Sequence, residues 1–118
     1  MPLVDRTYAF VKAFEHLVLL EIYRLNDYYE TDFKLSYLRT KDNAEIDLIV
    51  DRPGRATSLI EIKSTTQITK SDVRVLNAFK NDFDEPLVMC LSRDPRSKLI
   101  GDTKCLEWRE GLRTLFGP

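Results

Sequence analysis

The chain has 118 residues, of which 43% are hydrophobic, and its 18 Lys and Arg residues nearly balance 19 Asp and Glu residues. This length and composition predict a single domain over residues 1–118 with one hydrophobic core. The formal net charge of −1 excludes a surface that traps polyanions generally, so any contact with nucleic acid must be local. No apolar run approaches the roughly 20 residues that cross a bilayer, and no secretory signal opens the chain. We therefore expect a soluble, cytoplasmic protein that makes no membrane contact.

Apolar residues recur at helical spacing from Asp5 to about Tyr28, which predicts a long first helix. Asp5 is available to cap its N-terminus. The predicted buried stripe consists of Phe10, Phe14, Leu17, Val18, Ile22 and Leu25.

Three strands are predicted next, at residues 35–40, 44–50 and 57–63, where apolar residues alternate or cluster. Lys41-Asp42-Asn43 and Arg52-Pro53-Gly54-Arg55 supply the turn residues between them. Short connections of this kind predict an antiparallel three-strand meander.

The second half of the chain alternates helix and strand. A helix capped by Ser71 is predicted to end near Phe83, and a buried strand follows at residues 87–91. Because a helix connects them, the third and fourth strands should pair in parallel. A short strand at about residues 103–106 and a helix from Trp108 to Phe116 complete the chain. The sequence thus predicts an α/β sandwich with a mixed sheet of about five strands flanked by helices.

Two of the predicted strands carry acidic residues among apolar ones. In Ile60-Glu61-Ile62-Lys63, alternation sends Glu61 and Lys63 to one side and both isoleucines to the other. Asp47 lies between Ile46 and Leu48, where a lone carboxylate would be costly to desolvate. It must therefore be paired, protonated or bound to a cation.

The order of Glu15 on a helix, Asp47 on the second strand and Glu61-Ile62-Lys63 on the third resembles the PD-(D/E)XK nuclease superfamily. The similarity extends to the uncharacterised C-terminal domain of many bacterial and archaeal AAA-type ATPases. It rests on five segments: Phe14-Glu15-His16, Tyr37-Leu38-Arg39-Thr40, Glu45-Ile46-Asp47-Leu48-Ile49-Val50, Ile60-Glu61-Ile62-Lys63-Ser64 and Ser71-Asp72. The chain differs in having Ile46 where the superfamily name has proline, and Val11-Lys12-Ala13 where the ATPase-associated domain usually has glycine.

The resemblance implies metal-dependent hydrolysis of DNA by Glu15, Asp47, Glu61 and Lys63, and association with an AAA-type ATPase, fused or separate. Mg²⁺ or Mn²⁺ prefers oxygen ligands, which Asp47, Glu61 and the Ile62 carbonyl could supply, with Glu15 binding a metal water or a second ion. Lys63 would orient or deprotonate water, or neutralise developing charge. The candidate substrate-binding residues are Arg39 and Ser64.

The residues leave other interpretations open. Asp47 could instead pair with Lys63 or Arg39, and Glu21 competes with Glu15 for the inward position. Arg39 could pair with Glu45 or Asp47 rather than bind phosphate. At the level of function, the alternatives are an inactive nuclease fold that binds DNA or regulates an ATPase, and a protein-interaction domain that forms a homodimer.

Overall fold

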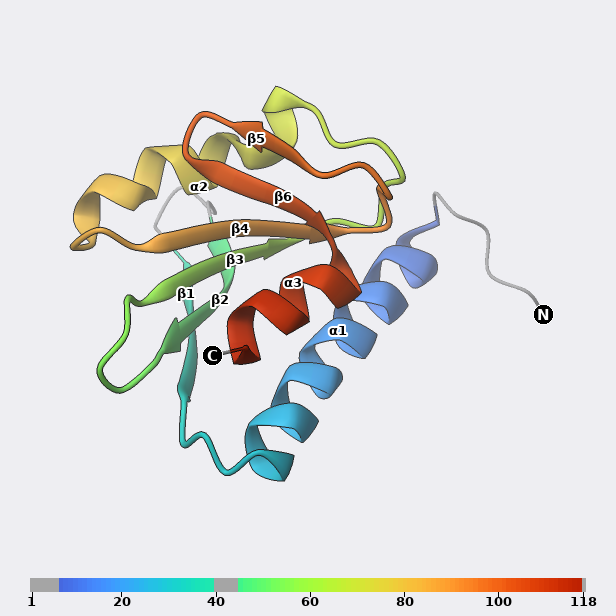
Figure 1. The fold of residues 1–118 in the computed structure, drawn as a ribbon. Helices are drawn as coiled ribbons and strands as arrows, with labels where there is room; N and C mark the ends of the chain where they lie inside the picture. The colour runs from blue at the N-terminus through green and yellow to red at the C-terminus, as the bar shows by residue number, and fades with distance from the viewer. Residues whose placement is uncertain (1–6, 40–44, 118) are drawn as a thin grey trace.

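A six-stranded mixed sheet forms the centre of the molecule in the computed structural model, which describes residues 7–39 and 45–117 (Figure 1). The sheet order is β1-β2-β3-β4-β6-β5. The elements are α1 (Tyr8–Tyr28), β1 (Lys34–Arg39), β2 (Glu45–Asp51), β3 (Ser58–Ile62), η1 (Lys70–Val73), α2 (Arg74–Phe79), η2 (Lys80–Asp82), β4 (Leu87–Ser92), β5 (Lys98–Ile100), β6 (Thr103–Glu107) and α3 (Trp108–Phe116).

The strand pairing confirms the predicted mixed sheet. β1, β2 and β3 pair in antiparallel order, and β3 pairs with β4 in parallel after the helical crossover. β4 also pairs with β6 in parallel, and β5 lies antiparallel to β6 at the sheet edge. β5 was not predicted, because three residues are too few to show a periodic pattern.

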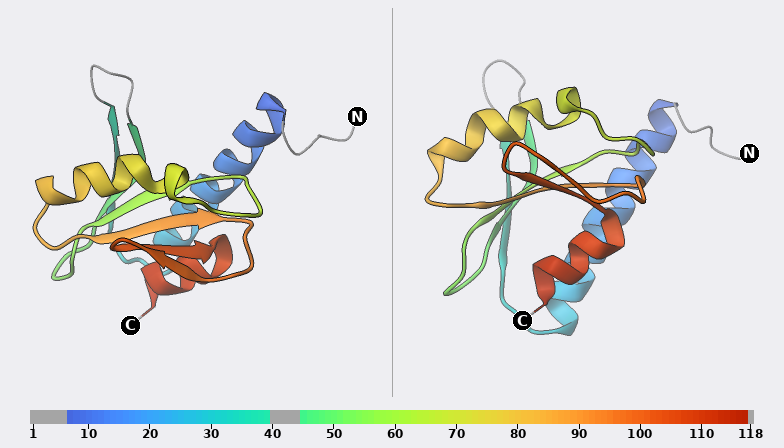
Figure 2. Two further views of the ribbon diagram at one scale, coloured as in Figure 1. Left: turned by 90° about the horizontal axis from the view of Figure 1, so that it is seen from above. Right: turned by 45° about the horizontal axis from the view of Figure 1, so that its top comes forward.

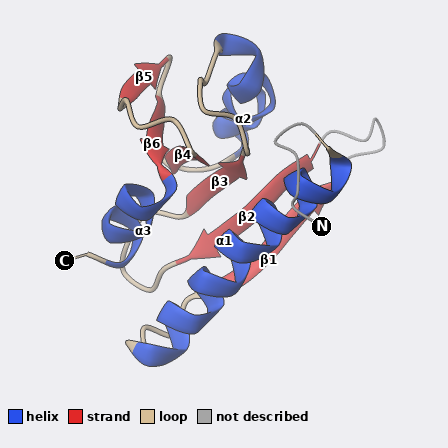
Figure 3. Cartoon of the chain, turned by 90° about the vertical axis from the view of Figure 1, so that its right-hand side faces the viewer, coloured by secondary structure: helices blue, strands red, loops and turns tan. Residues whose placement is uncertain are grey.

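The helices cover both faces of the sheet, as the three views together show (Figure 2, Figure 3). One core lies between the sheet and helices α1 and α3, and a second lies between the opposite face and α2. On the first face Phe14 of α1 meets Trp108 of α3 edge to face, with ring centroids 6.4 Å apart. The arrangement is the predicted α/β sandwich.

α1 is capped by Thr7, whose Oγ1 accepts a hydrogen bond from Phe10 N at 3.1 Å. The cap predicted at Asp5 lies outside the described residues. The helix buries Phe14, Val18 and Ile22. Leu17, predicted to be buried, is 50% exposed because the sheet and α3 cover mainly the side of the helix that carries Phe14, Val18 and Ile22.

The helical segment that crosses from β3 to β4 is a run of 3₁₀, α and 3₁₀ turns between Lys70 and Asp82. Thr69 is its N-cap, and Thr69 N donates to Asp72 Oδ2 at 2.8 Å. The prediction of Ser71 as the cap was therefore wrong, because the reciprocal partner Asp72 lies three residues after Thr69. The predicted end near Phe83 is confirmed.

Within residues 7–39 and 45–117, no helix combines the length and the apolar character that crossing a membrane requires.

Candidate active site

A bulge in the β1–β2 ladder lies at Asp47. Ser36 pairs with Ile49 and Leu38 with Ile46, so Asp47 and Leu48 together stand opposite the single residue Tyr37. The extra residue shifts the alternation of β2: Ile46 packs on the α2 side, whereas Leu48 packs on the α1 side. Asp47 therefore lies at the point in β2 where the in-and-out alternation of side chains is reversed.

The pairing of β2 with β3 also ends beside Asp47. The last pair in this direction is Leu48 with Ile60, so Asp47 and Glu61 are the next opposed residues. Ile62 N donates to the carboxylate Oδ2 of Asp47, at 2.7 Å, rather than to a strand carbonyl. The Asp47 side chain thus takes the place of the next strand-to-strand hydrogen bond and is held against β3.

Glu61 is a buried acid with few partners. The residue is 8% exposed, and Lys63 Nζ lies 3.5 Å from its Oε1. Among the residues that the structure describes, its Oε2 is buried and has no hydrogen-bond partner. Burial and the neighbouring charge of Asp47 raise the pKa of Glu61 to about 8, although Lys63 opposes the shift. A positively charged ligand beside Glu61 would stabilise the ionised form of its carboxyl group.

Lys63 and Ser64 lie just past the end of β3. Lys63 N donates to Leu91 O at 2.9 Å, which fixes the backbone against β4, while the Lys63 side chain is 38% exposed. The Ser64 carbonyl accepts from Arg93 Nε at 2.7 Å, and the Arg93 guanidinium lies over the ring of Phe10, 4.7 Å from its centroid. The Ser64 backbone is therefore tied to the loop after β4.

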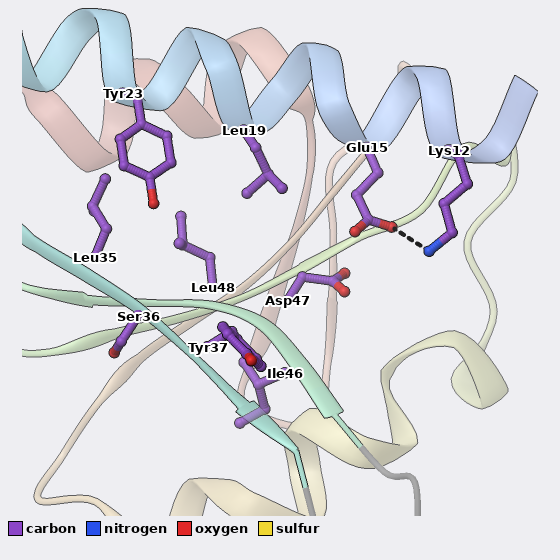
Figure 4. Close-up of a pocket in the computed structure, with 10 residues that line it drawn as sticks. All are labelled: Lys12, Glu15, Leu19, Tyr23, Leu35, Ser36, Tyr37, Ile46, Asp47 and Leu48. Atoms are coloured by element: carbon purple, nitrogen blue, oxygen red, sulfur yellow. Dashed lines mark ion pairs between the residues drawn. The ribbon is translucent and has the colours of Figure 1, made fainter.

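Glu15 of α1 and Asp47 line one pocket of about 600 Å³ between the helix and β1–β2 (Figure 4). Figure 4 shows the Glu15 carboxylate pointing from α1 toward the strand that carries Asp47, with Lys12 beside it. The Lys12 Nζ to Glu15 Oε2 distance is 4.0 Å. Glu21 instead pairs with Arg24 and lines a different pocket against α3. Glu15 is thus the inward acid of α1.

The predicted site residues come together only in part. Asp47, Glu61 and Lys63 are neighbours at the opening between β2 and β3, and Glu15 shares a pocket with Asp47. Across residues 7–39 and 45–117, no group of three acidic, His or Cys side chains is close enough to hold a metal ion. The side chain of Arg39 lies outside the described part of the chain.

Four further residue types line the pocket that sequence analysis did not assign to the site. They are a lysine, two tyrosines, a serine and an apolar wall: Lys12, Tyr23, Ser36, Tyr37, Leu19, Leu35, Ile46 and Leu48. Lys12 was detectable from its position one helical turn before Glu15. Tyr37 was not, because its position depends on the bulge.

The geometry describes an α/β sandwich with paired carboxylates and an amine where two central strands separate. Residues 11–108 match the family described as the domain of unknown function DUF4143, and the chain belongs to that family. The domain is commonly found with AAA ATPases. Comparison with curated proteins and with solved structures found no match for the chain.

Proposed function

We propose that this domain is a metal-dependent nuclease of the PD-(D/E)XK superfamily that hydrolyses phosphodiester bonds in DNA. The observation that carries the proposal is Glu61, whose buried Oε2 has no hydrogen-bond partner within the described chain while Asp47 stands opposite. Buried polar atoms in folded proteins nearly always have a partner, so an exception calls for a missing ligand. Two adjacent carboxyl groups favour a cation as that ligand.

The donor set fits a hard divalent ion. Mg²⁺ is commonly held by one or two carboxylates, and waters and substrate phosphate complete its shell, so three protein acids in one cluster are not required. Asp47, Glu61 and the Ile62 carbonyl would hold Mg²⁺ or Mn²⁺ at the end of β3. When bound, the ion polarises the phosphate and lowers the pKa of a coordinated water.

The other polar groups have separate tasks. The partly exposed Lys63 Nζ, held near Glu61, can donate a hydrogen bond to the attacking water or to a phosphate oxygen that gains charge. Glu15 faces the same pocket as Asp47 and can accept a hydrogen bond from a water there. In this proposal Ser64 and Arg39 contact the DNA backbone. An AAA-type ATPase module, fused or separate, is the proposed partner.

Cleavage of plasmid and branched DNA with Mg²⁺, Mn²⁺ or EDTA tests the proposal. We expect metal-dependent cutting, which Asp47→Asn lowers by about 100-fold or more because a charge that acts in the transition state is lost. Asp51→Asn makes the same chemical change on β2 at an exposed position and should cut normally. Absence of cutting with both metals, or equal cutting by Asp47→Asn, would overturn the proposal.

A second candidate is a nuclease fold without activity that binds DNA or regulates the ATPase. It is favoured by the finding that no three acidic, His or Cys side chains in residues 7–39 and 45–117 cluster closely enough for a metal. In that case titration with Mn²⁺ would show no binding, while DNA binding would persist.

A protein-interaction role is favoured by one surface. α1 leaves Leu17 and Leu20 50% and 54% exposed, which is a feature of helices that pack against another chain. Light scattering over a range of concentrations would reveal a homodimer, which is one form that this role can take.

A further inference from the structure

We propose that the pocket between α1 and β1–β2 binds one unpaired base of a DNA strand, so that the substrate of this domain is single-stranded DNA. The inference rests on the proposed nuclease function, which places the scissile phosphate beside Asp47 and Glu61. It adds to that function the class of nucleic acid and the residues that select it.

The pocket has the size and the two-part lining that a nucleotide needs. Its volume is about 600 Å³, within the range of sites that enclose small organic groups. Lys12, Glu15 and Asp47 gather at one end of the pocket. Tyr23 and Leu35 lie at the other end, with Leu19 and Leu48 in the middle (Figure 4). A nucleotide can match both parts of this lining, because its phosphate can contact Lys12 while its base lies against the apolar side chains.

Two tyrosines supply the aromatic surface. Tyr23 is 53% exposed and Tyr37 is 72% exposed, and both line the pocket. In Figure 4 the Tyr23 side chain points from α1 toward the strands, and Tyr37 extends from β1. Proteins that bind single strands use exposed aromatic rings of this kind, because each unpaired base offers a flat face for stacking.

The bulge links the aromatic ring to the acid. Tyr37 stands opposite Asp47 and Leu48, so the same irregularity that places the carboxylate also places the ring. A base stacked on Tyr37 would therefore keep the adjoining phosphate near Asp47. This coupling sets the position of the strand relative to the acids.

The charge of the pocket also favours a single strand over a duplex. Among the described residues that line it, in 7–39 and 45–117, Lys12 is the one cation, and Lys12 is already near Glu15 and the ring of Tyr8. Binding of duplex DNA depends on several phosphate contacts, and the bases of a duplex are stacked within the helix. A site with one lysine and two tyrosines is therefore better matched to an unpaired base.

Fluorescence anisotropy with a labelled oligothymidylate tests the inference, in EDTA and at low ionic strength so that no turnover is involved. Tyr23→Ala and Tyr37→Ala should each weaken binding by about fivefold or more, which is the lower range for loss of one stacked base. Tyr28→Ala is the matched control, because Tyr28 is 71% exposed and lies outside the pocket. A hairpin duplex should compete at least about tenfold less well than the single strand.

A single abasic nucleotide provides a second measurement. An oligonucleotide with one abasic position should bind the wild-type chain more weakly than the intact oligonucleotide does. The affinity of Tyr37→Ala should be the same for both oligonucleotides. Unchanged affinity in both pocket variants, or equal competition by duplex, would overturn the inference.

The two proposals can fail separately. Binding that depends on the tyrosines without cleavage by any metal would retain the pocket and reject hydrolysis. Metal-dependent cutting of duplex that both tyrosine variants retain would support hydrolysis and reject the pocket.

Discussion

Two buried acids in this molecule have opposite environments. Asp94, in the loop after β4, is 2% exposed, and Glu61 of β3 is 8% exposed. Ile68 N and Arg96 N each donate to the Asp94 carboxylate at 3.0 Å, and Lys98 Nζ lies 3.0 Å from it. Burial alone would raise the pKa of Asp94, but these hydrogen bonds outweigh it and hold that pKa well below the usual range.

Glu61 has the reverse balance. Burial and the charge of Asp47 dominate over Lys63, and the pKa of Glu61 rises to about 8. Low solvent exposure of a carboxylate therefore does not by itself define its role. An acid whose donors are supplied by the protein holds the fold together, whereas an acid that lacks them is ready for a ligand.

The largest expected effect is at Asp94. Asp94 accepts hydrogen bonds from Ile68 N and Arg96 N and pairs with Lys98. In Asp94→Asn, the amide N–H groups would face these donors and find no acceptor. Leaving buried N–H groups unpaired costs about 1–3 kcal/mol each, so we expect a loss of about 3 kcal/mol in the free energy of unfolding. Urea denaturation at neutral pH measures it, and a loss below about 1 kcal/mol would contradict the structural role.

Replacing the carboxyl of Glu61 with an amide, as in Glu61→Gln, should raise the free energy of unfolding rather than lower it. Because the pKa of Glu61 is raised in the folded state, the folded chain keeps a proton that the unfolded chain releases. Stability therefore falls as the pH rises from about 4.5 to about 8 and is level above that. Glu61→Gln cannot ionise, so in EDTA its stability should exceed that of the wild-type chain by a margin that grows as the pH rises from about 4.5 to about 8.

Urea denaturation of both proteins across this pH range is the measurement. Near pH 4.5 the two should be almost equally stable, because glutamine resembles the protonated acid in shape. A difference that does not change with pH would show that Glu61 is ionised in the folded chain at neutral pH.

The smallest effect is expected at Lys63. Its side chain is 38% exposed and its charge lowers the pKa of Glu61, so Lys63→Gln should raise that pKa further. The fall in stability with pH would then extend to higher pH than in the wild-type chain. The free energy of unfolding should differ from that of the wild-type chain by less than about 1 kcal/mol, because solvent screens an exposed ion pair. Denaturation above pH 8 measures the shift, and Lys12→Gln, which leaves Glu61 untouched, is the control.

The order of elements was predictable from the sequence because periodicity and turn residues act locally. The closing helix, Trp108–Phe116, has the predicted bounds, and the parallel pairing of β3 with β4 follows from their helical connection. The opposition of Asp47 to Glu61 was predictable to the extent that both lie on neighbouring strands of a meander.

Other features depend on distant contacts. Strict alternation would place Ile46 and Leu48 on one face, and only the pairing with β1 reveals the bulge that separates them. Asp94 follows Arg93 in a polar loop with no periodic signal, and its burial depends on the backbone of Ile68, which is 26 residues away. Neither the bulge in β2 nor the burial of Asp94 can be predicted from hydrophobic periodicities of 2.0 or 3.6 residues.

Calorimetric titration with Mn²⁺ tests the central claim, that Glu61 and Asp47 form a cation site. The wild-type chain should bind one ion near neutral pH, with a heat that varies with the buffer because the proton of Glu61 is released. Glu61→Gln should show no such binding. Identical titration curves for the wild-type chain and Glu61→Gln would contradict the claim.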